Sequence, residues 1–92
     1  MKYRIQSTGI FKKDLKRIKK RGYRMQLLDE VVTLLSEGEK LSAKYKDHTL
    51  SGNFADYREC HVTPDWILVY RIEDEYLYLV LSRTGTHSDI FG

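Results

Sequence analysis

The feature that most constrains this chain of 92 residues is a change in the spacing of its apolar side chains. Up to Gly38 they recur about every three to four residues, the period of an amphipathic helix. From Tyr57 onward they alternate or run almost without interruption, which is typical of β-strands. A chain of this length has room for one compact domain. We therefore predict a single α+β domain over residues 1–92, with helices packed on one face of a sheet.

The first part of the chain is predicted to form a strand and then a helical hairpin. Residues 3–7 alternate apolar or small with polar side chains, which indicates a short strand. Thr8 is suited to cap a helix that ends at Gly22. A second helix is predicted from Tyr23 to Glu37, with Gly38 as its stop.

The second part is predicted to be an antiparallel meander, so that the twisted sheet is mainly antiparallel. The expected strands are Tyr57–Val62, Trp66–Ile72 and Tyr76–Thr84. The only proline, Pro64, lies in the turn between the first two of them. Residues 85–92 are expected to be a short irregular tail. The face of the sheet opposite the helices is predicted to be free, and a free polar face is a candidate working surface.

Charge is distributed unevenly between the two parts. Residues 1–24 contain ten lysines and arginines and one acid, Asp14, whereas the remaining 68 residues contain six and twelve. A segregated basic surface is typical of a protein that binds a polyanion, either nucleic acid or an acidic protein segment. A solvated, lysine-rich helix face is the alternative interpretation. The lysines expected on the outer side of the first helix are Lys12, Lys13, Lys16, Lys19 and Lys20.

Several classes of protein are disfavoured by composition. The start of the chain has no apolar run long enough for a signal peptide, and no later stretch could span a bilayer. A single cysteine, Cys60, cannot form an intramolecular disulfide or a cysteine-based zinc cluster, and its alternation with Glu59 places it in the core. We therefore expect a cytoplasmic protein without membrane contact.

The candidate catalytic residues are three histidines and an aspartate. His48 is expected before the sheet, His61 near a strand end and His87 in the tail, all outside the helices, while Asp65 lies in the turn after His61. Histidine exchanges protons near neutrality because its free pKa is about 6.5. RNA cleavage by the 2′-hydroxyl needs one group that removes a proton, one that donates a proton, and cations that stabilise the phosphorane.

Other side chains could assist this chemistry. Lys46, Arg58 and Arg83 are the nearby cations, and Phe91 or Trp66 could stack on a base. For Trp66, packing inside the hairpin is the preferred interpretation. A zinc site is an alternative use of the same histidines, but no compact histidine spacing is present, so no metal and no cofactor are expected.

Three stretches of the sequence closely resemble the YafQ family of type II toxins, a branch of the RelE superfamily. They are Tyr45–Gly52, Tyr57–Tyr70 and Arg83–Gly92. Their pattern reads K-D-H-x-L-x-G, then Y-R-x-x-H-V-x-P-D-W-I-L-x-Y, then R-T-G-[TS]-H-x-x-x-F. The pattern fixes order, spacing and length together, and the resemblance covers the whole chain.

The resemblance implies a RelE-like fold and a ribosome-dependent endonuclease that cleaves mRNA. It also implies a cognate antitoxin of the DinJ/RelB type, whose acidic segment wraps the toxin, and contact with rRNA. The family's active-site residues carry over onto His48, His61, Asp65 and His87, and its C-terminal aromatic onto Phe91.

The sequence leaves several alternatives open. Relatives often have aspartate where this chain has Glu59, and the longer side chain argues against a direct role for it. One alternative function is a ParE-like toxin that binds DNA gyrase and needs no acid–base residues. Another is a non-catalytic module that binds RNA or protein. The sequence does not assign the base and the acid among the histidines.

Overall fold

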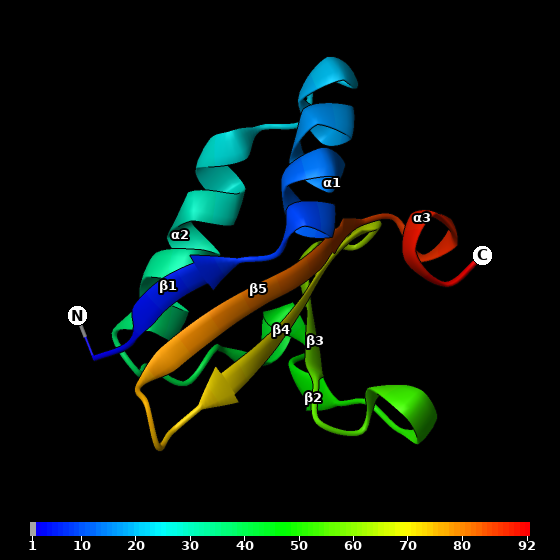
Figure 1. Ribbon diagram of the computed structural model, residues 1–92. Coiled ribbons are helices and arrows are strands. Elements are labelled where there is room, and N and C mark those ends of the chain that lie inside the picture. Colours follow the sequence, from blue (N-terminus) through cyan, green and yellow to red (C-terminus); the bar gives the residue numbers. More distant parts are fainter. Residues whose placement is uncertain (1) are drawn as a thin grey trace.

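The computed structural model describes residues 2–92, which form a sheet with two helices on one side and a short helix at its far end (Figure 1). None of the helices within these residues has the length and hydrophobicity that a membrane span requires. The strands are β1 Arg4–Ser7, β2 His48–Thr49, β3 Arg58–Thr63, β4 Trp66–Glu73 and β5 Tyr78–Gly85. The helices are α1 Gly9–Lys20, α2 Met25–Ser36 and α3 His87–Phe91, with single 3₁₀ turns η1 Ala43–Tyr45 and η2 Gly52–Phe54.

The sheet has five strands in the order β1-β5-β4-β3-β2. Strand β1 is parallel to β5, whereas the other three neighbouring pairs are antiparallel. The predicted α+β class and the mainly antiparallel sheet are therefore confirmed. Strand β1 can lie parallel to β5, the last strand, because the helical hairpin that follows β1 acts as a crossover between β1 and the antiparallel strands.

The helices begin and end close to the predicted positions. The Thr8 hydroxyl caps α1 by accepting a hydrogen bond from the backbone N–H of Phe11 at 3.0 Å. Gly22 and Gly38, which follow the two helices, have φ angles of 81° and 77°, a conformation that glycine adopts without steric penalty.

The core lies between this helical pair and one face of the sheet. The buried apolar residues come from α1, α2, β3, β4 and β5, with Tyr3 and Leu41 at the edges. Cys60 belongs to this core, as predicted, and burial raises the pKa of its thiol to about 12. Trp66 is also a packing residue, because it is 2% exposed and its indole N–H donates to Thr84 Oγ1 at 2.8 Å. The core side chains of the helices are Phe11, Ile18, Leu28, Val31 and Leu35.

Three predictions about the second half of the chain were wrong. Residues 87–91 form α3 rather than an irregular tail, so His87 is in a helix. His48 does not precede the sheet but forms its edge strand with Thr49. The face opposite α1 and α2 is not entirely free, because Ile67 and Val69, which alternate with core residues along β4, are only 3% and 0% exposed.

Candidate active site

The candidate site begins with a cluster on the edge strand β2 and its neighbour β3. His48 is the register partner of Glu59, so the two side chains emerge next to each other from the same face of the sheet. Glu59 Oε2 is 3.0 Å from His48 Nε2 and 3.9 Å from His61 Nε2. The glutamate is buried, whereas half of the His48 side chain is exposed. One carboxylate therefore lies beneath two imidazoles that solvent can reach.

The Nδ1 atoms of both histidines, which face away from Glu59, contact backbone carbonyls. His48 Nδ1 is 2.7 Å from the carbonyl oxygen of Lys46, and His61 Nδ1 is 3.2 Å from that of Pro64. A carbonyl oxygen can only accept a hydrogen bond, so both contacts place a hydrogen on Nδ1. They orient both Nε2 atoms towards Glu59. Lys46 can present its carbonyl in this way because its backbone is left-handed, with φ of 49°.

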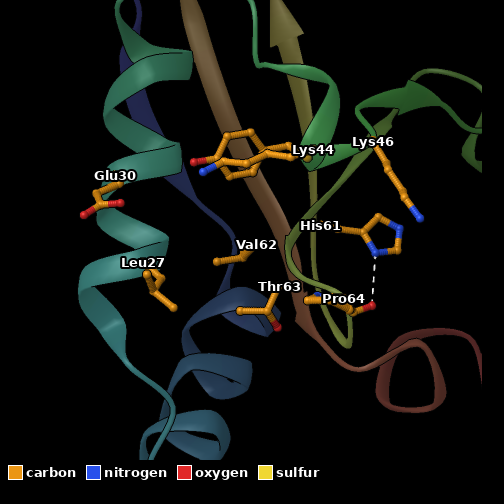
Figure 2. Close-up of a pocket in the computed structure, with 9 residues that line it drawn as sticks. Leu27, Glu30, Lys44, Lys46, His61, Val62, Thr63 and Pro64 are labelled. Carbon is orange, nitrogen blue, oxygen red and sulfur yellow. Dashed lines mark hydrogen bonds between the residues drawn. The ribbon is translucent and has the colours of Figure 1, made fainter.

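Figure 2 shows how β3 directs alternate side chains to opposite sides. Val62 points towards α2, whereas His61 points away from it, with its ring joined to Pro64 by the hydrogen bond drawn. Lys46 and His61 both line a pocket of about 380 Å³ between α2 and β3. Lys46, one of the predicted cations, is exposed at this position.

A second hollow, of about 490 Å³, joins the cluster to the end of the chain. His48 and Glu59 lie on one side of it, and His87 and Phe91 of α3 contribute the other. The Phe91 ring centre is 4.9 Å from that of His87 and 5.5 Å, edge to face, from that of Phe54. His48 and His87, which are far apart in sequence and were predicted to act together, therefore line one open hollow, and Phe91 lines it with them, whereas His61 lines the pocket next to α2.

The structure separates Asp65 from this hollow. Its side chain is exposed in the turn between β3 and β4 and lines a different depression, next to Tyr23 and Trp66. Within residues 2–92 no hydrogen bond or ion pair joins Asp65 to a histidine. Asp65 directly follows Pro64, whose carbonyl accepts a hydrogen bond from His61. The β3–β4 turn is therefore the only link between Asp65 and the cluster that the described residues show.

Two of the predicted cations are held by buried or half-buried aspartates. The Arg58 guanidinium donates to both carboxylate oxygens of Asp47, and the Tyr70 hydroxyl donates to the same carboxylate at 2.5 Å. Arg83 donates to both oxygens of Asp14 on α1, at 2.8 and 3.3 Å. These hydrogen bonds raise the pKa of each arginine. Both guanidinium groups thus have structural partners at the border of the site.

Glu59 is the residue whose importance the sequence did not establish. Alternation along β3 places Glu59 and His61 on one face, and this was the sequence feature that could have linked Glu59 to the histidines. The contact with His48 was not visible, because a two-residue strand is too short to give a periodic pattern. One carboxylate oxygen of Glu59 is at hydrogen-bond distance from His48 and at the longer distance of 3.9 Å from His61.

Comparison with known proteins identifies the class to which this fold and site belong. Residues 3–92 match the model of a bacterial toxin of a type II toxin–antitoxin system, YafQ. The mRNA interferase toxin YafQ of Escherichia coli K12 is 44% identical over 89 residues, which cover 96% of this chain and 95% of that protein. The chain belongs to the YafQ family of type II toxins, as its sequence motifs predicted.

Solved structures agree with this assignment. The E. coli DinJ–YafQ toxin–antitoxin complex contains a chain that superposes with a TM-score of 0.89 at 42% identity, covering 100% of both chains. A metal-bound toxin from Helicobacter pylori superposes with a TM-score of 0.91 at 44% identity, covering 99% of this chain and 100% of that one. In the present protein, no group of three His, Cys, Asp or Glu side chains within residues 2–92 is arranged to hold a metal ion.

Proposed function

We propose that this chain is an mRNA interferase, an endoribonuclease that cleaves mRNA on the ribosome by activating the 2′-hydroxyl of the substrate. The observation that carries the proposal is the cluster in which Glu59 Oε2 is 3.0 Å from His48 Nε2 and 3.9 Å from His61 Nε2. The cluster borders an open hollow whose other side carries His87 and Phe91. Membership in the YafQ family supports the same function.

The hydrogen bonds of His48 and Glu59 support a role for this pair as the proton donor. Nδ1 of His48 is committed as a donor to the Lys46 carbonyl. A hydrogen bond between Nε2 and Glu59 then needs one further proton, either on the imidazole or on the carboxyl group. The pair therefore stores a proton that it can release to the departing 5′-oxygen.

His61 has the complementary arrangement. Its Nδ1 carries the hydrogen that the Pro64 carbonyl accepts, and its Nε2 is 3.9 Å from Glu59, beyond hydrogen-bond distance. In the neutral imidazole, Nε2 then has a free lone pair and can accept the proton of the 2′-hydroxyl. Asp65 follows Pro64 and is proposed to act through this turn, as a group that holds His61 in place.

His87 completes the catalytic set in this proposal, because from the other side of the hollow it stabilises the charge that develops on the scissile phosphate. The remaining residues bind the substrate, and Phe91 stacks on a base next to the cut. Lys46 is exposed and supplies positive charge near the phosphate. Arg58 and Arg83 contribute to the positive potential of the site from their places in the ion pairs.

The reaction balances without a cofactor. The 2′-oxygen forms a bond to the neighbouring phosphorus and gives its proton to His61. The bond from phosphorus to the 5′-oxygen breaks, and the leaving oxygen takes the proton held by His48 and Glu59. The products are a 2′,3′-cyclic phosphate and a 5′-hydroxyl, and the enzyme has gained one proton and lost one.

The test is single-turnover cleavage of mRNA on programmed ribosomes. An mRNA with a 2′-deoxy residue at the scissile position should not be cut, whereas one with the same change a nucleotide upstream should be cut normally. Replacing His61 or His48 by alanine should each lower the rate by roughly 10²–10⁴, the usual effect of a general acid or base. Replacing His87 by alanine should lower it by roughly 10²–10³, the usual effect of losing one group that stabilises charge in the transition state. Cleavage of the scissile deoxy substrate, or stoichiometric zinc or copper in the active toxin, would favour a metal-activated water instead.

We further propose that the partners are mRNA and rRNA of the cytoplasmic ribosome and a cognate antitoxin with an acidic segment. The support is the exposed row of five lysines on α1, namely Lys12, Lys13, Lys16, Lys19 and Lys20. Their electrostatic contribution should make antitoxin binding weaken steeply with salt. An affinity that stays flat between low and high salt would contradict this part. Gyrase binding is disfavoured because it gives the histidine cluster no role.

A further inference from the structure

The short helix α3 needs an external support. It has five residues, and a helix of this length is not stable in isolation, because nucleation is unfavourable. It nevertheless carries His87 and Phe91, whose positions decide the geometry of one side of the hollow. The position of α3 must therefore be set by contacts with other elements.

Asp89 makes the contact at the beginning of this helix. Its backbone N–H donates to the Thr86 hydroxyl at 3.1 Å, and its Oδ2 accepts from the backbone N–H of Thr86 at 2.9 Å. This reciprocal pattern is a capping box, which fixes the direction in which a helix starts. The negative charge also interacts favourably with the N-terminal end of the helix dipole.

The same carboxylate binds helix α1. Arg21, at the end of α1, donates Nη1 to Oδ2 at 2.6 Å and Nη2 to Oδ1 at 2.9 Å, so the pair is bidentate. Arg17 lies one turn earlier, with Nη1 at 3.7 Å from Oδ1. The Asp89 side chain is only 14% exposed, and these contacts lower the pKa of its carboxyl group well below the ordinary value. The carbonyl of Asp89 also accepts from Arg83 Nη2 at 3.4 Å.

The end of β5 is shaped to admit this carboxylate. Gly85 has φ of 148°, and a Cβ atom at this position would lie 2.8 Å from Asp89 Oδ2 and 3.0 Å from Asp89 Cβ. Any side chain at residue 85 would therefore displace Asp89 from its place between α3 and α1. The close approach depends on glycine.

We propose that Asp89 is a positioning residue, which clamps α3 to α1 through Arg21 and so places His87 and Phe91 across the hollow from His48 and Glu59. This inference rests on the proposed function, since it assumes that His87 acts in cleavage. Arg21 is 39% exposed, and ion pairs of such exposure contribute little to global stability. The clamp should thus affect the rate of the reaction much more than the stability of the fold.

Two substitutions remove the charge pair with little change of shape. In Asp89→Asn the amide oxygen can still accept from Thr86 N–H, so the cap is kept while the charge that holds Arg21 is lost. Arg21→Gln removes the partner instead. Arg4→Gln is the matched control, because Arg4 is exposed and pairs with Tyr78, at the opposite end of β5 from Gly85.

The measurement is the single-turnover rate at saturating ribosomes, where weaker ribosome binding no longer limits cleavage. Asp89→Asn and Arg21→Gln should each lower this rate by roughly 10- to 100-fold, the effect of a misplacement of about 1 Å, and the double variant should be no slower than either. Arg4→Gln should keep the parental rate, and Arg21→Lys should recover part of the loss. Amide hydrogen exchange at Ile90 and Gly92, which donate to Thr86 and Ser88 within α3, should become faster in both variants.

The two proposals fail in different ways. If His87→Ala keeps the parental rate, the role of His87 in the proposed function is wrong. If His87→Ala is inactive but Asp89→Asn and Arg21→Gln both cleave at the parental saturating rate, the clamp is overturned. Faster exchange in α3 without loss of rate also overturns it, because the contact would then stabilise the helix without positioning a catalytic group.

Discussion

Replacing Asp14 by alanine should destabilise the fold by about 3–4 kcal/mol, because it breaks a buried ion pair from one side. Asp14 is 1% exposed and lies on α1, facing β5. Its carboxylate accepts from Arg83 Nε at 2.8 Å, from Arg83 Nη2 at 3.3 Å and from the backbone N–H of Thr84 at 3.1 Å. These are the polar contacts that attach α1 to the last strand next to the candidate site.

The magnitude follows from what the substitution leaves behind. Arg83 is 25% exposed and would keep only the 3.4 Å contact with the carbonyl of Asp89. Removing one partner of a buried pair typically costs about 3–5 kcal/mol, and a buried N–H left without an acceptor costs about 1–3 kcal/mol. The cost of the unpaired Arg83 charge and the cost of the unpaired Thr84 N–H do not simply add, because water can partly reach both groups after the substitution. We therefore expect the total to lie near the lower end of the first range.

Urea unfolding followed by tryptophan fluorescence measures this loss. Trp66 is the only tryptophan and is buried against Tyr23, so its emission reports on the core. With a slope of about 1–3 kcal/mol per molar urea, the midpoint should fall by roughly 1–4 M. The melting temperature should fall by roughly 12–32 °C, since each kcal/mol shifts it by about 4–8 °C in a domain of this size. Asp29→Ala, an exposed change of the same kind on α2, should alter stability by no more than about 0.5 kcal/mol.

A double variant separates the ion pair from simple loss of packing. Asp14→Leu combined with Arg83→Met replaces both partners by apolar groups and should recover the part of the stability that depends on the ion pair, because neither charge is then left unpaired, although the Thr84 N–H still lacks its acceptor. The reasoning would be refuted if Asp14→Ala stayed within about 1 kcal/mol of the parent, a value typical of an ordinary point substitution. A double variant as unstable as Asp14→Ala would refute it equally.

Three further predictions concern the site and the core. Glu59→Gln should lower the saturating cleavage rate by roughly 10²–10³, since it removes the carboxylate that holds a proton with His48, while Glu75→Gln in an exposed turn should cleave normally. Phe91→Leu should weaken binding of ribosome-bound mRNA by roughly tenfold or more without changing the cut position, because base stacking contributes about 1–3 kcal/mol; unchanged binding would remove Phe91 from the substrate site. Burial raises the pKa of the Cys60 thiol from 9.0 to about 12, so the folded state binds its proton more tightly and stability should fall as pH rises from about 9 to 12. Urea midpoints across this range should drop less in Cys60→Ala than in the parent, and an equal drop would show that this thiol is not responsible; some drop should remain, because burial also raises the pKa of Tyr70.

The local elements were predictable because their signals are local. Apolar spacing along Phe11–Leu35 predicted both helices, and Thr8, Gly22 and Gly38 marked their limits. Pro64 marked the hairpin turn. The local signal for α3 was also present, in the capping box formed by Thr86 and Asp89, but five residues are too few for a periodic pattern to support it.

The sequence motifs placed this chain in its family and singled out the histidines, because order and spacing are properties of the sequence itself. How the histidines are arranged was decided by tertiary structure. His48 meets Glu59 only because β2 pairs with β3, and His87 reaches the same hollow only because α3 packs at the end of β5. No periodic pattern encodes a two-residue strand or a hydrogen bond between residues 70 apart, such as the one from the backbone N–H of Thr84 to the Asp14 carboxylate. These contacts form because a folded chain must satisfy nearly all of its buried charges and N–H groups, a condition that applies to the whole molecule rather than to any segment.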